Sequence, residues 1–230
     1  MTNQNIKKLV TAALLAAMTC VATMIIKIPT PTFGYIHPGD GFVLLCGVVL
    51  GPLPGALAAG IGSMFSDIFS GYVTWAPATF IIKALTGGIA GLLFHRFKNT
   101  LHSKKGRYAA LAIGGIVGEA IMVIGYFLYE TGLAALGSGV LNQASIAAGI
   151  ASSATGIPFN IVQGVVGIIL CLFFRLIAHF LSLLFRFFLD FLRLLGRLLH
   201  RLLRNWLVPL VLDAAEFPDA HIGIDCKDVV

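Results

Sequence analysis

The chain has 230 residues, of which 58% are hydrophobic and only 11% are charged, and its mean hydropathy is +0.93. Soluble domains carry about a quarter charged residues, so a water-soluble fold of this length would not hide so much apolar surface. The apolar runs are continuous rather than alternating, which argues against a membrane β-barrel. The net charge of +6 comes largely from basic residues at the ends of apolar runs, so we expect an all-α integral membrane protein and no nucleic-acid partner.

The apolar runs predict roughly six membrane-spanning segments, since each helical span needs about 20 apolar residues. In chain order we expect them at 9–28, at two short proline-interrupted halves (42–50 and 56–69), at 78–97, at 108–129 and from about 157 onward. The Gly-, Ser- and Ala-rich stretch 131–156 is predicted to be a loop. Basic residues cluster before the first run, between 96 and 107, and after the last run, so the positive-inside rule predicts a multi-pass protein of the cell membrane with both termini in the cytoplasm.

Three regions follow from this pattern: a membrane bundle at 1–178, a basic amphipathic helix at 179–207, and an acidic tail at 208–230 that we expect to be disordered. The amphipathic helix is predicted because the polar residues fall on one stripe at 100° per residue while nearly all others are Leu or Phe. Such a helix suits the inner interface of membrane lipid. The stripe consists of Arg175, His179, Ser182, Arg186, Asp190, Arg193, Arg197, His200, Arg201 and Arg204.

Two charged residues are the clear cases of a charge well inside a predicted span. Lys83 is near the start of the fourth span, and Glu119 is near the middle of the fifth. A charged side chain in lipid costs several kcal/mol, so an intramembrane charge indicates a functional site by default. Lys83 and Glu119 either pair with each other or meet a polar ligand, and the structural alternative is a simple ion pair or a lysine that reaches the interface.

Further polar and aromatic residues lie in the predicted outer half of the bundle. Asn160 and Gln163 share one face of the last span, and their amides can bind a ligand or join helices. Tyr126 is two turns from Glu119 on the same face, and Trp75 lies in the preceding outer loop, where it either covers a pocket or anchors at the interface. This convergence of polar groups predicts a small-molecule pocket.

No motif for chemistry accompanies these residues. There is no P-loop, no GxSxG and no HExxH, so we expect no enzyme activity, no ATP-binding site of its own and no cofactor. His37 and Asp40 are too few for a metal site, and Asp67 is expected to cap or pack. Two alternatives remain open, a membrane-embedded enzyme built on Glu119 and a scaffold protein that transports nothing. The four cysteines (Cys20, Cys46, Cys171 and Cys226) show no ligand spacing, and the three that lie inside apolar runs, Cys20, Cys46 and Cys171, are expected to be small core residues.

The first span carries overlapping pairs of alanines four residues apart: Ala12, Ala13, Ala16 and Ala17. Small residues at this spacing allow another helix to approach closely. The partner helix is either in another protein or in the same bundle.

Several motifs in this order resemble the substrate-binding S component of energy-coupling factor (ECF) vitamin transporters, over about 6–178. They are Tyr35-Ile-His-Pro-Gly-Asp40-Gly, Leu50-Gly-Pro-Leu-Pro-Gly-Ala56, Ser66-Asp-Ile-Phe-Ser-Gly-Tyr72, Ala76-Pro-Ala-Thr-Phe-Ile-Ile-Lys83, Gly125-Tyr126-Phe and Pro158-Phe-Asn160-Ile-Val-Gln163-Gly164.

The resemblance implies a bundle of six transmembrane helices that captures a vitamin or its precursor outside and delivers it inward. The ligand class is that of riboflavin, pyridoxine or hydroxymethylpyrimidine, and the residues here do not choose among them. A transmembrane T subunit and two ATPase subunits supply the energy, and the alanine motif of the first helix contacts the T subunit. The family pocket maps onto Asp40, Lys83, Glu119, Tyr126, Asn160 and Gln163, with Trp75 at its mouth. Family members usually end near 178, so the helix and tail that follow are a departure from the pattern.

Overall fold

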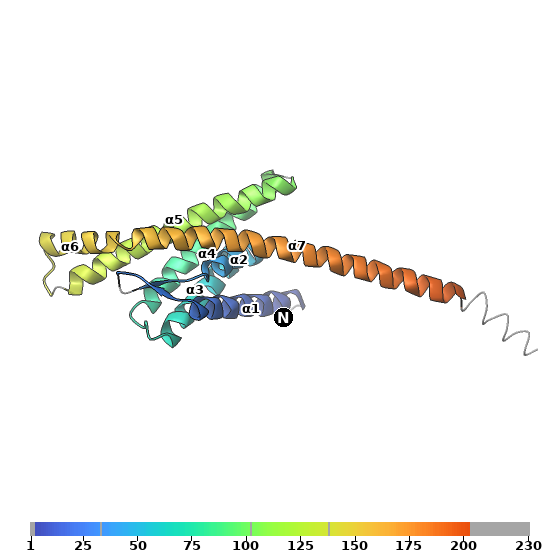
Figure 1. Cartoon of the computed structure of the whole chain (residues 1–230), viewed down its shortest axis with the longest axis horizontal. Coiled ribbons are helices and arrows are strands. Elements are labelled where there is room, and N and C mark those ends of the chain that lie inside the picture. Colours follow the sequence, from blue (N-terminus) through green and yellow to red (C-terminus); the bar gives the residue numbers. More distant parts are fainter. Residues whose placement is uncertain (1–2, 33, 102, 138, 203–230) are drawn as a thin grey trace, which may run out of the picture. The chain divides into compact units, whose positions relative to one another are not determined.

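The computed structural model describes residues 3–202 except 33, 102 and 138 (Figure 1). It is built almost entirely of helices, and the chain divides into two compact units, 1–176 and 177–230. In chain order the elements are α1 (Asn3–Ile25), β1 (Ile28–Pro29), β2 (Tyr35–Ile36), α2 (Asp40–Leu50), α3 (Pro52–Phe69), α4 (Ala76–Thr100), α5 (Lys104–Gly137), α6 (Gln143–Ala154) and α7 (Ile157–Leu202).

Four of the described helices are long and apolar enough to cross a membrane, which makes this a multi-pass membrane protein. They are α1, α4, α5 and α7, and α2 is a shorter apolar helix. Large hydrophobic side chains are exposed along the outer faces of these helices, as expected where the solvent is lipid. The count of six spans stays a prediction.

The break predicted between the second and third helices is a single residue. Gly51 adopts φ +89°, a conformation that favours glycine, and Pro52 occupies the first turn of α3, where its missing N–H removes no hydrogen bond. Two short helices thereby follow each other directly, and both pack against α4.

The segment between α1 and α2 forms a small antiparallel hairpin, in which Ile28 pairs with Ile36 and Pro29 with Tyr35. It is the one departure from the all-helical expectation among the described residues. The hairpin leads directly into α2, so Asp40, expected in a loop, is instead the first residue of that helix.

The predicted loop at 131–156 is wrong for most of its length. The helix α5 continues to Gly137, and α6 occupies Gln143–Ala154. Alanine favours helix strongly, and Asn142 caps α6 through a reciprocal pair of hydrogen bonds with Ser145. The Gly and Ser content by itself favours a loop, whereas the alanines and this capping pair favour a helix.

The predicted last span and the predicted amphipathic helix are one continuous helix, α7, as far as Leu202. The rest of the proposed helix (203–207), including Arg204, and the acidic tail (208–230), including Cys226, lie outside the described residues.

Two apolar clusters form the core of the first unit. One is shared by α2, α4, α5 and α7, and the other by α1, α2 and α3. Since α2 contributes to both clusters, it is surrounded by the other helices, which places its first residue in the interior. The two clusters contain Leu44, Val48, Ala90, Phe94, Ala110, Leu111 and Cys171, and Leu15, Val43, Cys46, Ala58 and Ala59.

Candidate functional site

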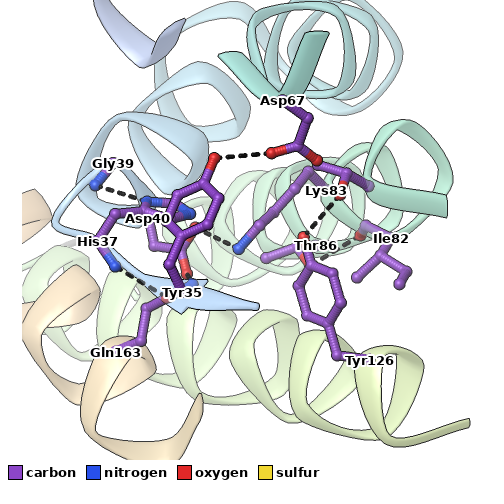
Figure 2. Close-up of polar contacts among 11 residues, drawn as sticks. Tyr35, His37, Gly39, Asp40, Asp67, Ile82, Lys83, Thr86, Tyr126 and Gln163 are labelled. Carbon is purple, nitrogen blue, oxygen red and sulfur yellow. Dashed lines mark hydrogen bonds and ion pairs between the residues drawn. The ribbon is translucent and has the colours of Figure 1, made fainter. Parts of the chain in front are cut away.

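A fully buried ion pair lies at the centre of the first unit. Lys83 Nζ of α4 is 2.5 Å from Asp40 Oδ1 of α2, and neither side chain is exposed to any extent (Figure 2). The close parallel packing of α2 and α4 brings the two residues together. Lys83 thus pairs with Asp40. A pair between Lys83 and Glu119 was one of the alternatives from the sequence, and no such ion pair occurs among the described residues.

Gln163 connects this ion pair to the hairpin segment. Its Nε2 donates a hydrogen bond to Asp40 Oδ2 (2.6 Å), and its Oε1 accepts one from the backbone N–H of His37 (3.0 Å) (Figure 2). The His37 Nδ1 in turn accepts from the Gly39 N–H at 3.1 Å. Burial lowers the pKa of His37 to about 3, so the ring is neutral at physiological pH, as an accepting Nδ1 requires.

Glu119 lies beside Asp40, and its carboxyl group has no hydrogen-bond partner among the described residues. It is 4% exposed, and neither carboxyl oxygen makes a hydrogen bond of normal geometry with a described residue. Two glycines of α7 make room for it, because a Cβ on Gly164 would approach the Glu119 Cβ to 2.9 Å and one on Gly167 would approach Glu119 Oε1 to 3.2 Å. The face of the last span that was predicted to carry Asn160 and Gln163 is therefore the face that packs against Asp40 and Glu119.

A cavity lies next to this network, between the hairpin and the ends of several helices. The cavity itself has a volume of about 30 Å³. The atom-free space is about 400 Å³ when the open mouth of the cavity is counted as well. Pockets for small ligands typically measure roughly 300–1,000 Å³, so a ring-sized ligand requires the lining side chains to move apart. The lining residues are Thr30, Gly34, Tyr35, His37, Tyr72, Trp75, Tyr126, Glu130, Asn160 and Gln163.

Aromatic rings make up much of the cavity wall. The ring centroids of Tyr35 and Tyr72 are 4.8 Å apart, and those of Trp75 and Tyr126 are 6.4 Å apart. The Tyr126 hydroxyl donates to Thr79 Oγ1 at 3.2 Å, which fixes the ring. Flat faces of this kind stack on planar ligands.

Tyr35 is held by Asp67, the residue expected only to cap or pack. The Tyr35 hydroxyl donates to Asp67 Oδ1 at 2.7 Å (Figure 2). Burial and the neighbouring carboxylate both raise the pKa of Tyr35, so the phenol stays protonated and remains a donor. Asp67 therefore positions a wall of the cavity.

The structure divides the predicted ligand residues into two groups. Trp75, Tyr126, Asn160 and Gln163 line the cavity. Asp40, Lys83 and Glu119 are buried outside its lining, and Gln163 links the first two of these to it. A role in ligand binding stays a prediction for all seven.

Sequence reasoning missed several lining residues, most clearly Glu130. It is 7% exposed, and its Oε1 accepts a hydrogen bond from Thr32 at 3.1 Å. A signal was present, because Glu119, Tyr126 and Glu130 are spaced seven and four apart and so share one helix face. Glu130 lies directly after the predicted end of the fifth span, between it and the predicted loop at 131–156, and was not among the predicted site residues.

The four alanines of α1 do not share one environment. Ala12 and Ala16 are half-buried and pack against the core, whereas Ala13 and Ala17 are exposed. Internal packing thus accounts for one pair, and the other pair is open to a partner helix.

Metal chemistry finds no support in the described part of the chain, where no group of three or more His, Cys, Asp or Glu side chains could hold an ion. The site instead offers stacking surfaces, amide groups and one carboxyl group, which are the means of reversible recognition of a polar ring compound.

Comparison with known proteins agrees with this reading. A family model described as "ECF-type riboflavin transporter, S component" matches residues 3–178. A solved structure titled "Structure and mechanism of the S component of a bacterial ECF transporter" is similar with a TM-score of 0.52 and 26% identity, covering 78% of this chain and 99% of that one.

A protein of Pyrococcus woesei, named "Uncharacterized protein in gap 3'region", is 36% identical over 107 residues, which is 46% of this chain. The chain spans 66% of the length of that relative. The family match covers most of the first unit and ends close to the boundary between the two units.

Transporter S components are substrate-binding membrane subunits rather than enzymes, and the cavity with its amide and aromatic lining is consistent with that task. Because the family model covers residues 3–178, this chain belongs to the S components of ECF-type riboflavin transporters.

Proposed function

We propose that this chain captures riboflavin, or a vitamin with a similar planar ring, on the outer side of the cell membrane and delivers it inward. One observation carries the proposal: four aromatic rings and the amides of Asn160 and Gln163 line one cavity in a member of this family. Rings stack on a flat heterocycle, and amides pair with its carbonyl and N–H groups. The membrane-enzyme and scaffold alternatives have no comparable support.

The energy for transport is proposed to come from partners, a transmembrane T subunit and two ATPase subunits. The exposed alanines of α1 support a docking face, because Ala13 and Ala17 leave the helix open to close approach. An apolar groove adjoins them, lined by Ala17, Met18, Val21, Ala22, Ile25 and Phe42. In this arrangement both termini are cytoplasmic, as the distribution of basic residues predicts.

Native mass spectrometry of the gently purified protein, followed by release of bound small molecules, tests the ligand assignment. A co-purified flavin would support it. If the protein carries pyridoxine or a hydroxymethylpyrimidine instead, the proposed ligand is replaced while the transport role stands. A protein that retains no ring compound and gains no thermal stability from a vitamin panel would count against the transport role.

Replacing Asn160 by leucine is expected to weaken riboflavin binding about tenfold or more. The amide is 8% exposed and lies at the cavity wall, so its loss leaves a polar ligand group without a partner. Quenching of riboflavin fluorescence on titration measures the dissociation constant. Gln143→Leu is the matched control, since Gln143 is exposed and does not line the cavity. Equal loss in both variants would contradict a binding role for Asn160.

The second unit is proposed to bind the headgroups of anionic membrane lipid. In its described part the arginines are exposed, and only Arg193 has an ion-pair partner there, the exposed Asp190. The Leu and Phe side chains beside them are exposed as well. An apolar surface with a basic stripe is typical of helices that lie in the interface.

The double variant Arg193→Gln and Arg197→Gln is expected to retain less anionic lipid in detergent, because each basic residue near such a surface contributes about 1 kcal/mol. Native mass spectrometry with added phosphatidylglycerol and phosphatidylcholine measures the retained lipid. Lysine at the same two positions keeps the charge and should keep the lipid. Unchanged retention in the glutamine variant would show that the stripe has another role.

A further inference from the structure

One carboxyl oxygen in the cavity wall has no partner in the described part of the chain. Glu130 Oε1 accepts the Thr32 hydroxyl, and Thr32 is held in turn by Thr30 at 3.0 Å, whereas Glu130 Oε2 is buried without a hydrogen bond. Buried polar atoms are rarely left unsatisfied, because the lost hydration is not recovered. The arrangement aligns the carboxyl group and leaves one acceptor available.

A glycine packs closely beside this oxygen. Gly156 forms the turn between α6 and α7, and a Cβ there would come within 3.0 Å of both Glu130 Oε2 and Thr32 Cγ2. A larger residue at this position would fill the space next to the free acceptor. Glu130 lines the cavity, and its carboxyl group keeps this position because the residue packed beside it has no Cβ.

The described lining contains no lysine or arginine to balance this carboxyl group, and its histidine, His37, is neutral. Lys83 lies 5.3 Å from the Tyr126 ring centroid and is paired with Asp40, and Lys27 lies 5.2 Å from the Tyr35 ring centroid and contacts Ser70. Both of these lysines, which lie over rings of the cavity wall, are thus engaged by contacts of their own. Glu130 is the one carboxyl group of the described lining, and the neutral wall groups can both donate and accept hydrogen bonds.

We propose that Glu130 determines ligand specificity: its free oxygen accepts a hydrogen bond from a hydroxyl or N–H of the ligand, and its charge disfavours phosphorylated forms of the same ligand. The inference rests on the proposed function and sharpens it, because it selects a neutral, donor-bearing flavin over one that carries a phosphate. A phosphate placed near an unpaired carboxylate is repelled, which is a common source of specificity.

The test compares riboflavin with flavin mononucleotide, which has the same ring and chain with a terminal phosphate. The wild-type protein is expected to bind riboflavin at least about tenfold more tightly. In Glu130→Gln, which keeps the shape and the acceptor for Thr32, riboflavin binding should weaken about tenfold and the preference over flavin mononucleotide should largely disappear. Asp190→Asn removes the same charge outside the cavity lining and should leave both dissociation constants unchanged.

A third ligand, lumiflavin, locates the donor, since it has the ring without the hydroxyl chain. A Glu130→Gln effect confined to riboflavin assigns the bond to a hydroxyl, and an equal effect on lumiflavin assigns it to the ring N–H. Wild-type protein that binds riboflavin and flavin mononucleotide equally well would overturn the inference and leave the proposed function standing, even if the variant failed to fold. Wild-type protein that binds no flavin would overturn both.

Discussion

Replacing Lys83 by methionine is expected to destabilise the protein by about 3–5 kcal/mol, because it leaves the Asp40 carboxylate buried without its counter-charge. The side chains of both residues are completely buried in the interior of a membrane bundle. Removal of one partner from such a pair costs more than the pair itself contributes, since the remaining charge is neither hydrated nor neutralised.

Thermal unfolding in detergent, followed by loss of the helical circular dichroism signal, measures this effect. A decrease in Tm on the order of 10 °C is expected. Lys105→Met makes the same chemical change at an exposed position and should alter stability by less than about 0.5 kcal/mol. Adding Asp40→Asn to Lys83→Met should recover part of the loss, because asparagine is neutral and still accepts from Gln163. A Lys83→Met protein as stable as the control would show that the ion pair is replaceable.

The double variant Lys83→Met with Asp40→Asn also distinguishes the predicted site residues that line the cavity from those buried beside it. Gln163 lines the cavity and is held by Asp40 and by the His37 backbone. If Asp40 acts only by positioning Gln163, the neutral double variant should bind ligand almost as well as the wild type. If Asp40 or Lys83 contacts ligand directly, binding should be lost even though the fold recovers.

The membrane helices were predictable because lipid imposes a simple rule, that every span must be a long apolar helix. The prediction failed at 131–156, where the choice between helix and loop depends on short-range capping rather than on apolarity. Asn142 and Ser145 satisfy each other's backbone groups, and alanines carry the helix on from there. Glycine and serine content alone indicates loops in water, and it is a poor guide in a membrane bundle where small residues let helices pack closely.

Individual candidate residues of the site could be predicted from the sequence, but the contacts between them could not. Lys83 and Glu119 stood out because each is a charge within an apolar run. The partner of Lys83 is Asp40, which lies 43 residues away in the chain and begins a helix that was predicted to start only at residue 42. A single sequence holds no information on such long-range pairing, and the helix packing that decides it is set by glycines whose contacts appear only in three dimensions.

The helix pair that carries Asp40 and Lys83 depends on one such glycine. A Cβ on Gly47 of α2 would overlap the carbonyl oxygen of Gly87 and approach the Gly91 nitrogen to 2.8 Å, both in α4. These are backbone atoms, so no rotation of a side chain relieves the overlap, and the helices must separate. Gly47→Ala is therefore expected to destabilise the protein by about 3 kcal/mol, at the upper end of the cost of overpacking a core.

Gly132→Ala is the matched control for Gly47→Ala, and the opposite effect on stability is expected. Gly132 lies within α5, and a Cβ there meets nothing within 4 Å, so alanine should be neutral or stabilising by up to about 1 kcal/mol through its higher helix propensity. The difference between the two variants isolates the contact between α2 and α4 from any general effect of alanine. Equal stability of the two variants would mean that α2 moves away from α4 at little cost.

Gly47→Ala should weaken riboflavin binding as well as lower the stability of the protein. Gly47 lies two helical turns beyond Asp40, and Gly87 and Gly91 lie one and two turns beyond Lys83, so the glycine contact and the ion pair belong to the same parallel pair of helices. Separation of the helices moves Asp40 away from Lys83 and releases Gln163 from the cavity wall. We expect the folded fraction of Gly47→Ala to bind riboflavin at least about tenfold more weakly than the wild type, whereas Gly132→Ala binds it normally. Normal riboflavin affinity in folded Gly47→Ala would mean that the cavity does not depend on the position of α2.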